Sequence, residues 1–133
     1  MKEFEILKPE ILQNLMNIEF GDDYFDLHND YKCYQIQHFI EKGELKLSFK
    51  ASEVNSLKKS PVHIIFKEID MKKISFISGE LDEIMTIDSL YRGRFEENSI
   101  LREYSTEGKA YYYLEFYDGY RFELFASNIA FLF

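Results

Sequence analysis

Residues 110–126 alternate between apolar and polar side chains, and this alternation constrains the fold more than any other feature of the sequence. A period of two places successive side chains on opposite faces of a β-strand. We predict a hairpin with Tyr117-Asp118-Gly119 as its loop and Gly119 in a left-handed bulge, because a two-residue turn at Asp118-Gly119 would mix the two faces. The predicted cross-strand pairs are Phe116/Tyr120, Leu114/Phe122, Tyr112/Leu124 and Ala110/Ala126 on one face, and Glu115/Arg121, Tyr113/Glu123 and Tyr111/Phe125 on the other.

Other segments show strand patterns of the same kind. Residues 31–50 predict a hairpin around Lys42-Gly43, because that register gathers the apolar side chains on one face. Its predicted pairs are Ile40/Leu45, His38/Leu47 and Ile36/Phe49. Further strands are predicted at Val62–Ile69, at Ile74–Ser78 as its hairpin partner, at Ile84–Ile87 and at Ile129–Phe133, with a turn at Asp88–Gly93.

The N-terminal region predicts one helix, at about residues 9–19. Pro9 suits a first helical position, and Gly21 suits the point where the chain leaves the helix. Between them, Ile11, Leu12, Leu15 and Met16 recur at helical spacing and form one apolar stripe.

Composition agrees with a β-rich chain, since the sequence has 13 Phe and 10 Tyr, residues that strands favour. A chain of 133 residues forms one domain, here residues 1–133. We therefore expect a mainly β fold, an antiparallel β-sandwich or partly open barrel of about eight strands, with the one N-terminal α-helix packed against it. Ile129–Phe133 should pack into the sheet, because an exposed apolar edge there would invite aggregation. A monomer or a homodimer is expected, with Ile129–Phe133 as the dimer edge if that strand is unpaired.

The charge of the chain limits its partners. The net charge is −8, with −6 in residues 1–30, +3 in residues 31–80 and −5 in residues 81–133. This balance argues against nucleic acid and anionic membranes as partners, and an acidic surface can steer a basic protein partner. The sequence shows no signal peptide and no apolar run of the roughly 20 residues that cross a bilayer. Its single cysteine suits a reducing compartment, so a cytoplasmic location is expected.

The residues that carry catalysis or bind metals in other proteins form no recognisable set here. His28, Cys33 and His38 are spaced by five, which in a strand would place Cys33 and His38 on opposite faces, with His38 in the core. The acidic residues Asp22, Asp23, Asp26 and Asp30 lack the pattern of a calcium loop. We expect no catalytic residues, no metal and no cofactor, and hence no enzyme.

The most suggestive surface is the polar face of the C-terminal hairpin. It would carry aromatic side chains beside carboxylates, a combination that anchors protein interfaces. The alternative is that another element of the fold covers this face. The candidate partner-binding residues are Tyr111, Tyr113, Glu115, Glu123 and Phe125.

One stretch of the chain resembles a known family. Phe25-Asp26-Leu27-His28-Asn29-Asp30, followed by a strand, a turn and Gly43-Glu44-Leu45-Lys46-Leu47-Ser48-Phe49, is similar to a short Leu-His-Asp motif that precedes an alternating hairpin. That pattern, over residues 10–70, resembles small bacterial immunity proteins of polymorphic toxin systems, especially the immunity protein 50 family. Here the motif reads Leu-His-Asn-Asp, which is one residue longer. The resemblance implies a cytoplasmic inhibitor that binds a cognate toxin, and it brings no catalytic residues.

Three functional hypotheses follow from these observations, and the third, an enzyme that uses carboxylates outside any recognisable catalytic motif, is disfavoured because nothing singles out a pair among the 24 acidic residues. The first is a non-enzymatic protein-binding module, with toxin inhibition as its specific form. The second is a β-barrel that binds a small apolar molecule, since the chain has more Phe and Tyr than a compact core of this size requires.

Overall fold

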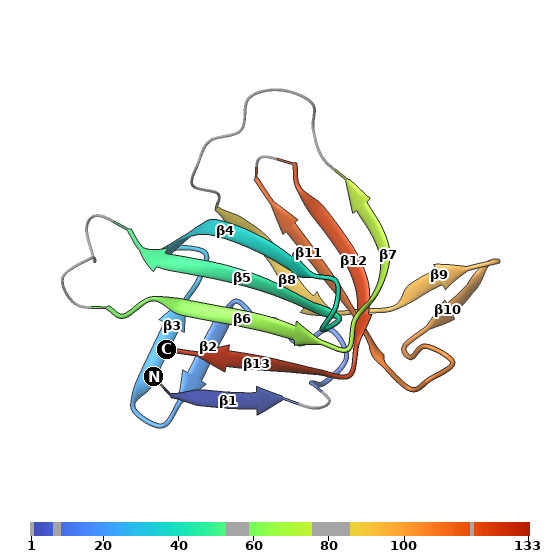
Figure 1. Cartoon of the computed structure of the whole chain (residues 1–133), viewed down its shortest axis with the longest axis horizontal. Helices are drawn as coiled ribbons and strands as arrows, with labels where there is room; N and C mark the ends of the chain where they lie inside the picture. The colour runs from blue at the N-terminus through green and yellow to red at the C-terminus, as the bar shows by residue number, and fades with distance from the viewer. Residues whose placement is uncertain (1, 7–8, 53–58, 76–85, 118) are drawn as a thin grey trace.

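The computed structural model describes residues 2–6, 9–52, 59–75, 86–117 and 119–133, and it is mainly β with antiparallel pairing throughout (Figure 1). A five-stranded sheet has the order β1-β13-β6-β5-β4, a four-stranded sheet has the order β7-β12-β11-β8, and β2-β3 and β9-β10 form two hairpins. The strands are β1 (Glu3–Ile6), β2 (Asn17–Phe20), β3 (Asp23–Asp26), β4 (Tyr31–Phe39), β5 (Glu44–Ala51), β6 (Val62–Lys67), β7 (Asp70–Ser75), β8 (Ile87–Arg92), β9 (Phe95–Glu97), β10 (Ile100–Arg102), β11 (Ala110–Phe116), β12 (Arg121–Ala126) and β13 (Asn128–Leu132).

Two pairs of strands join the sheets at one corner. β6 runs into β7 through Glu68, whose φ is +50°, and β12 runs into β13 through Ser127. The Ser127 hydroxyl donates to Glu68 at 2.7 Å, and the Ser127 amide donates to the carbonyl of Lys67 at 3.0 Å. The predicted hairpin of Val62–Ile69 with Ile74–Ser78 is therefore wrong for Ile74 and Ser75, because β7 pairs with β12 in the other sheet, and residues 76–78 of that prediction lie outside the described residues.

The core lies between the two sheets. The ring of Phe66 in β6 packs edge-on against the ring of Tyr112 in β11, with centroids 5.5 Å apart. Leu47 and Phe49 of β5 are buried in the same cluster as Leu114 of β11. Burial of these apolar side chains is the dominant favourable contribution to folding.

The C-terminal hairpin forms as the alternation predicts. All of the predicted pairs from Ala110/Ala126 to Glu115/Arg121 are present between β11 and β12. The amide of Phe116 donates to Tyr120, and the amide of Gly119, whose φ is +88°, donates to Phe116. The predicted bulged register is therefore confirmed.

The β4–β5 hairpin forms with a different register. Its turn is four residues long, so Ile36 pairs with Leu47 and His38 with Leu45, two positions away from the prediction. A bulge between Cys33 and Gln35 interrupts β4. The predicted register is wrong, although Ile36 and His38 still share a face with the buried leucines of β5.

The predicted helix at 9–19 is wrong, because this segment runs as an irregular strand along β8. The amides of Leu12 and Leu15 donate to the carbonyls of Arg92 and Leu90 in β8, at 2.7 and 2.8 Å. Leu12 has a φ of +62°, which a helix does not contain. Leu15 is buried and Leu12 is exposed, so the apolar stripe does not face the core as a unit.

Two further predictions concern the chain around β8 and β13. The predicted turn at Asp88–Gly93 is wrong, since β8 extends over most of it; residues 84 and 85 of the strand predicted before it lie outside the described residues. β13 lies between β1 and β6, so the predicted packing of Ile129–Phe133 into a sheet is confirmed, and this strand presents no unpaired edge. In the described part of the chain, no helix is long and apolar enough to span a bilayer.

Candidate functional site

The five candidate residues lie on the outer face of the four-stranded sheet but differ in exposure. Tyr111 and Phe125 are buried, whereas Tyr113, Glu115 and Glu123 are partly exposed. The ring of Phe95 in β9 covers both buried residues, with centroid distances of 5.8 Å to each. The hairpin β9–β10 therefore covers one end of this face and leaves the other end accessible.

Tyrosine hydroxyls on this face are held by carboxylates. The hydroxyl of Tyr111 donates to Glu123 and that of Tyr113 donates to Glu115, both at 2.5 Å. Burial, followed by these hydrogen bonds, raises the pKa of both tyrosines. The hydrogen bond from Tyr113 lowers the pKa of Glu115, and Arg121, 3.3 Å from that carboxylate, adds to the effect. The rings are thereby held in fixed orientations.

A hollow of about 450 Å³ lies between this face and the hairpin β9–β10. It contains three of the five predicted residues, while Glu115 lines a neighbouring hollow of about 390 Å³ together with Arg121. The larger hollow is lined by Leu12, Tyr91, Gly93, Arg94, Phe95, Glu96, Leu101, Tyr111, Tyr113 and Glu123.

Because residue 93 is glycine, the rings of Tyr91 and Tyr111 can pack closely against the backbone in the floor of this hollow. A Cβ atom there would lie 3.1 Å from the Tyr91 ring and 3.3 Å from the Tyr111 ring, which is closer than ordinary contact. The rings of Tyr91 and Tyr113 lie 5.3 Å apart on the same floor. The result is a continuous aromatic surface.

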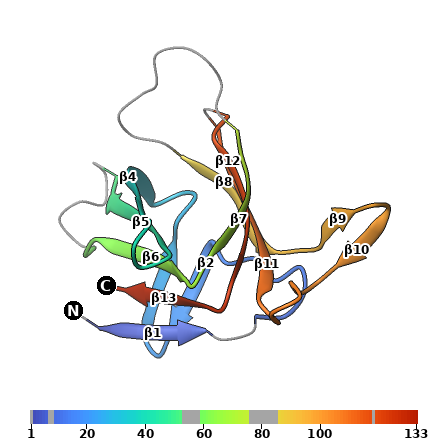
Figure 2. The same ribbon diagram turned by 45° about the vertical axis from the view of Figure 1, so that its right-hand side comes forward.

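Two exposed leucines flank the aromatic floor. Leu12 is 69% exposed and Leu101 is 59% exposed, although both line the hollow. Leu101 is held out by the hairpin β9–β10, which projects from the rest of the molecule (Figure 2). Its turn, Asn98-Ser99, has φ values of +52° and +65°, the geometry of a tight two-residue hairpin turn.

The sequence patterns identify three of the ten described residues that line the hollow and miss seven, of which Leu12, Tyr91, Phe95 and Leu101 supply its apolar and aromatic surface. The sequence pattern predicts Leu12 in a helix and Tyr91 in a turn, so neither is expected at this site. For Phe95 and Leu101 the sequence does indicate a hairpin, because Asn98 between them is among the residues that most readily take a positive φ at a hairpin turn.

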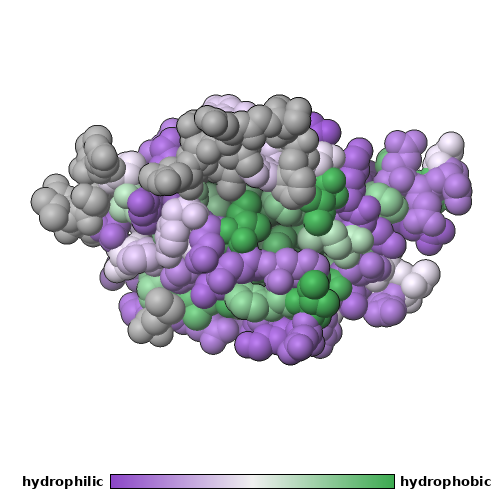
Figure 3. All heavy atoms as spheres, turned by 45° about the horizontal axis from the view of Figure 1, so that its top comes forward, coloured by the Kyte–Doolittle hydropathy of each residue, from purple (hydrophilic) through white to green (hydrophobic). Residues whose placement is uncertain are grey.

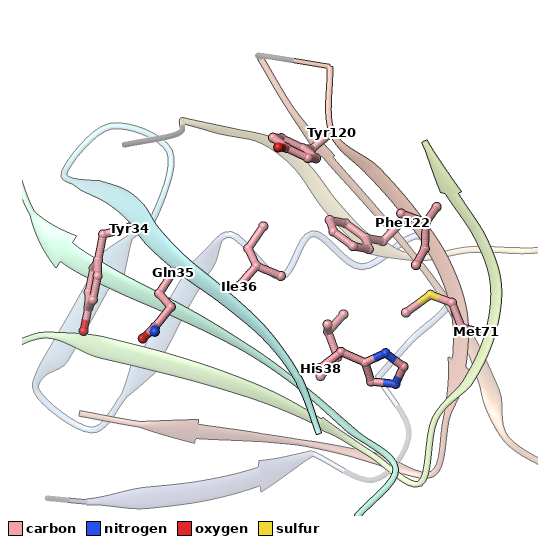
Figure 4. A pocket seen from close by; sticks show the side chains of 9 residues that line it. Tyr34, Gln35, Ile36, His38, Met71, Tyr120 and Phe122 are labelled. Atoms are coloured by element: carbon pink, nitrogen blue, oxygen red, sulfur yellow. The ribbon is translucent and has the colours of Figure 1, made fainter. Parts of the chain in front are cut away.

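A second concave site lies on the opposite side of the four-stranded sheet. It is a cleft of about 380 Å³ between β4 and the strands β7 and β12 (Figure 4). Figure 3, which brings the upper side of Figure 1 forward, shows apolar side chains gathered between hydrophilic ones. The cleft is lined by Tyr34, Gln35, Ile36, His38, Leu45, Met71, Ile74, Tyr120 and Phe122.

The histidines and the cysteine do not form a site with one another. The bulge in β4 makes the prediction of opposite faces wrong, since Cys33 pairs with buried Phe49 and His38 with buried Leu45. His38 is exposed, so its predicted core position is also wrong. Burial raises the pKa of the Cys33 thiol to about 12, which makes it a poor nucleophile. Within the described ranges, no three His, Cys, Asp or Glu side chains are grouped to hold a metal ion.

Three residues of the acidic run already have partners on the chain. Asp26 accepts hydrogen bonds from the amide and side chain of Asn29 at 3.1 and 2.8 Å. Asp23 lies 3.4 Å from Lys2, and Asp30 lies 2.6 Å from Lys59. These carboxylates therefore stabilise local structure.

Comparisons of the chain with protein-family models, with curated proteins and with solved structures give no match.

Proposed function

We propose that this protein is a non-enzymatic protein-binding module and that the hollow beside β9–β10 receives an apolar side chain of the partner. The observation that carries the proposal is the position of Leu12 and Leu101, both exposed at the rim of an aromatic floor. Protein interfaces concentrate their binding energy in such aromatic pockets, surrounded by polar groups that exclude water.

The charges at the rim favour a basic partner. Glu96 and Glu123 line the hollow together with a single cation, Arg94. The C-terminal part of the chain, which supplies nearly all of this surface, carries a net charge of −5. A partner with basic groups around an apolar anchor would be attracted over about 8–10 Å at physiological ionic strength.

Toxin inhibition is the specific form of this function that we propose, on the basis of the resemblance to immunity proteins. An inhibitor of this kind needs a stable surface that blocks its target, and it needs no catalytic residues. The preorganised floor of Tyr91, Tyr111 and Tyr113 supports that role, since rigid aromatic side chains lose little conformational entropy on binding.

For the architecture we propose an antiparallel β-sandwich, the first of the two predicted forms. The separate sheets and their shared corner support it, because β4 pairs with β5 and β7 with β12 while no pairing between β4 and β7 is present among the described residues.

Affinity capture of the tagged protein from extracts of its source cells, at low and moderate salt, tests the function. We expect one stoichiometric partner, lost with Leu101→Asp and kept with the control Ile40→Asp, which changes a side chain that is 80% exposed at the β4–β5 turn. A partner identified as the C-terminal part of a large secreted protein would support toxin inhibition. Equal capture by both variants would contradict the assigned surface, and no partner at either salt would contradict the function.

A further inference from the structure

We propose that the cleft between β4 and β7 is a second binding site, and that its ligand is a neutral aromatic small molecule. It lies on the inner side of the four-stranded sheet, opposite the hollow assigned to the protein partner. The inference therefore stands independently of the proposed function.

The corner of the fold creates the cleft. The β4–β5 turn is tied to the corner by a hydrogen bond from the Ile69 amide to the Gly43 carbonyl, at 2.9 Å. From that point β4 belongs to one sheet and β7 to the other, and the described residues show no pairing between them. Side chains from both strands consequently face a shared space whose walls are fixed by separate sheets (Figure 4).

Among the described residues that line the cleft, none is of a type with a fixed charge, and the one histidine is the exposed His38. Aspartate, glutamate, lysine and arginine are absent from the nine described residues that line it, although these types make up 30% of the chain. An ammonium group buried here would find no opposite charge among these residues, and a carboxylate or phosphate would find none when the His38 imidazole is neutral, so each would lose its hydration at a cost that weakens binding strongly. The ligand class that fits is therefore neutral.

The shape and polar groups of the cleft favour a flat aromatic ligand. Tyr120 and Phe122 present rings from the β11–β12 hairpin, and the Met71 thioether adds a polarisable contact. Tyr34 lies at the far end of the cleft, where Lys50 Nζ is 5.9 Å from the centre of its ring. Gln35 carries a donor and an acceptor at the wall of the cleft, so a ligand with one or two neutral polar groups can be oriented. A volume of about 380 Å³ falls within the usual range of small-molecule sites.

Two fluorescent probes that differ by a charge test the site. N-phenyl-1-naphthylamine is neutral, and 1-anilinonaphthalene-8-sulfonate is the same ring system with a sulfonate added. We expect the neutral probe to bind with enhanced fluorescence and the sulfonate to bind at least about 100-fold more weakly, because its charge would be buried without a partner. Comparable binding of the two, or no binding of the neutral probe at 100 µM, would overturn the proposal.

Variants on β7 locate the bound probe. Ile74→Trp places a large side chain in the cleft from a partly exposed edge position, and it should weaken binding of the neutral probe by at least about tenfold. Lys73→Trp is the matched control, because Lys73 pairs with Glu123, whose side chain lines the hollow on the outer face. An equal loss in both variants, or no loss in either, would contradict the assigned site.

Ile74→Lys supplies a test that does not depend on loss of binding. The new ammonium group would provide the missing counter-charge, so we expect the sulfonate probe to gain at least about tenfold in affinity. Amide chemical shift changes caused by the neutral probe should map to β4 and β7. Changes around Tyr91 and Leu101 instead would overturn the assignment, while leaving the capture experiment with Leu101→Asp as a separate measure of the proposed function.

Discussion

The two faces of the four-stranded sheet hold their tyrosines in different ways. On the inner face, the Tyr112 ring packs on Phe66, and its buried hydroxyl has no hydrogen-bond partner among the described residues. On the outer face, the hydroxyls of Tyr111 and Tyr113 both donate to glutamates. Neighbouring residues of one strand therefore contribute to stability by different means: burial of apolar area on one side, and hydrogen bonds to charged groups on the other.

This difference has a functional consequence. A face that combines rings with carboxylates can meet a charged, hydrated partner, because its polar groups are already satisfied when the partner approaches. The inner face ends in a cleft whose described lining has no Asp, Glu, Lys or Arg side chain, which suits a ligand that carries little hydration of its own.

Truncation of neighbouring residues should give the largest contrast. Leu114→Ala leaves a cavity in the inner face and should lower the free energy of unfolding by about 3 kcal/mol. Glu115→Ala, one position along β11, should lower it by under about 1 kcal/mol, because this carboxylate pairs at a partly exposed position. Urea unfolding measures both changes. Equal losses would show that the two faces do not differ as described.

Removal of the cover on the outer face should have the next largest effect. Phe95→Ala deletes two ring contacts, to Tyr111 and Phe125, and should cost about 1–2 kcal/mol in urea unfolding. Tyrosine fluorescence should also become more accessible to acrylamide. Tyr24→Ala, at an exposed position in the hairpin β2–β3, is the control and should change neither measurement by a comparable amount.

The same substitution at adjacent positions should have different effects on stability. Tyr111→Phe removes a hydrogen bond to a carboxylate and should destabilise the protein by about 1.5 kcal/mol. Tyr112→Phe removes a buried hydroxyl without a described partner and should leave stability unchanged or raise it slightly.

The Tyr112 variant also has a signature at alkaline pH. Burial raises the pKa of Tyr112 from 10.0 to about 12, so its stabilising contribution is complete below pH 10 and is lost as the pH rises towards 12. Tyr112→Phe should reduce the loss of stability between pH 9 and 11, measured by urea unfolding at each pH. An unchanged loss would contradict the burial of a neutral hydroxyl.

The smallest effect is expected at acidic pH on the outer face. The pKa of Glu115 is lowered from its ordinary value of 4.5, so its contribution is present above that value and is lost as the pH falls through the lowered pKa. Glu115→Gln should reduce the decline in stability between pH 6 and 3 by under about 1 kcal/mol. Tyr113→Phe should produce part of the same change, and the double variant should add little; additive effects would show that the two groups do not interact.

Sequence patterns correctly predicted those parts of the fold that are formed by residues close together in the chain. The hairpin β11–β12 follows from its alternation and from Gly119, which takes the positive φ of the bulge at little cost. The helix predicted at residues 9–19 is wrong because the amides of Leu12 and Leu15 donate to carbonyls of β8, and the spacing of residues within the segment does not reveal this contact. The corner at Glu68 was also missed, because glutamate is not a residue type that indicates a turn with positive φ.

The sequence also predicted some residues of the candidate site and missed others. Alternation placed Tyr111, Tyr113 and Glu123 on one face, and the structure brings all three to the hollow. Phe125 shares that face but is buried beside the ring of Phe95 at the start of β9. Leu12 reaches the site only through the long-range pairing with β8, so its contribution required the three-dimensional structure.

The pairing of β1 with β13 sets an order of events during protein synthesis. Phe4 pairs with Phe131, and Lys2 and Phe133 exchange two backbone hydrogen bonds, of 2.7 and 3.0 Å. At a translation rate of about 5–20 residues per second, β1 leaves the ribosome roughly 6–25 s before its partner strand. The edge of the five-stranded sheet can close only after translation has passed β13, so β1 takes its place in the sheet after that strand has been made.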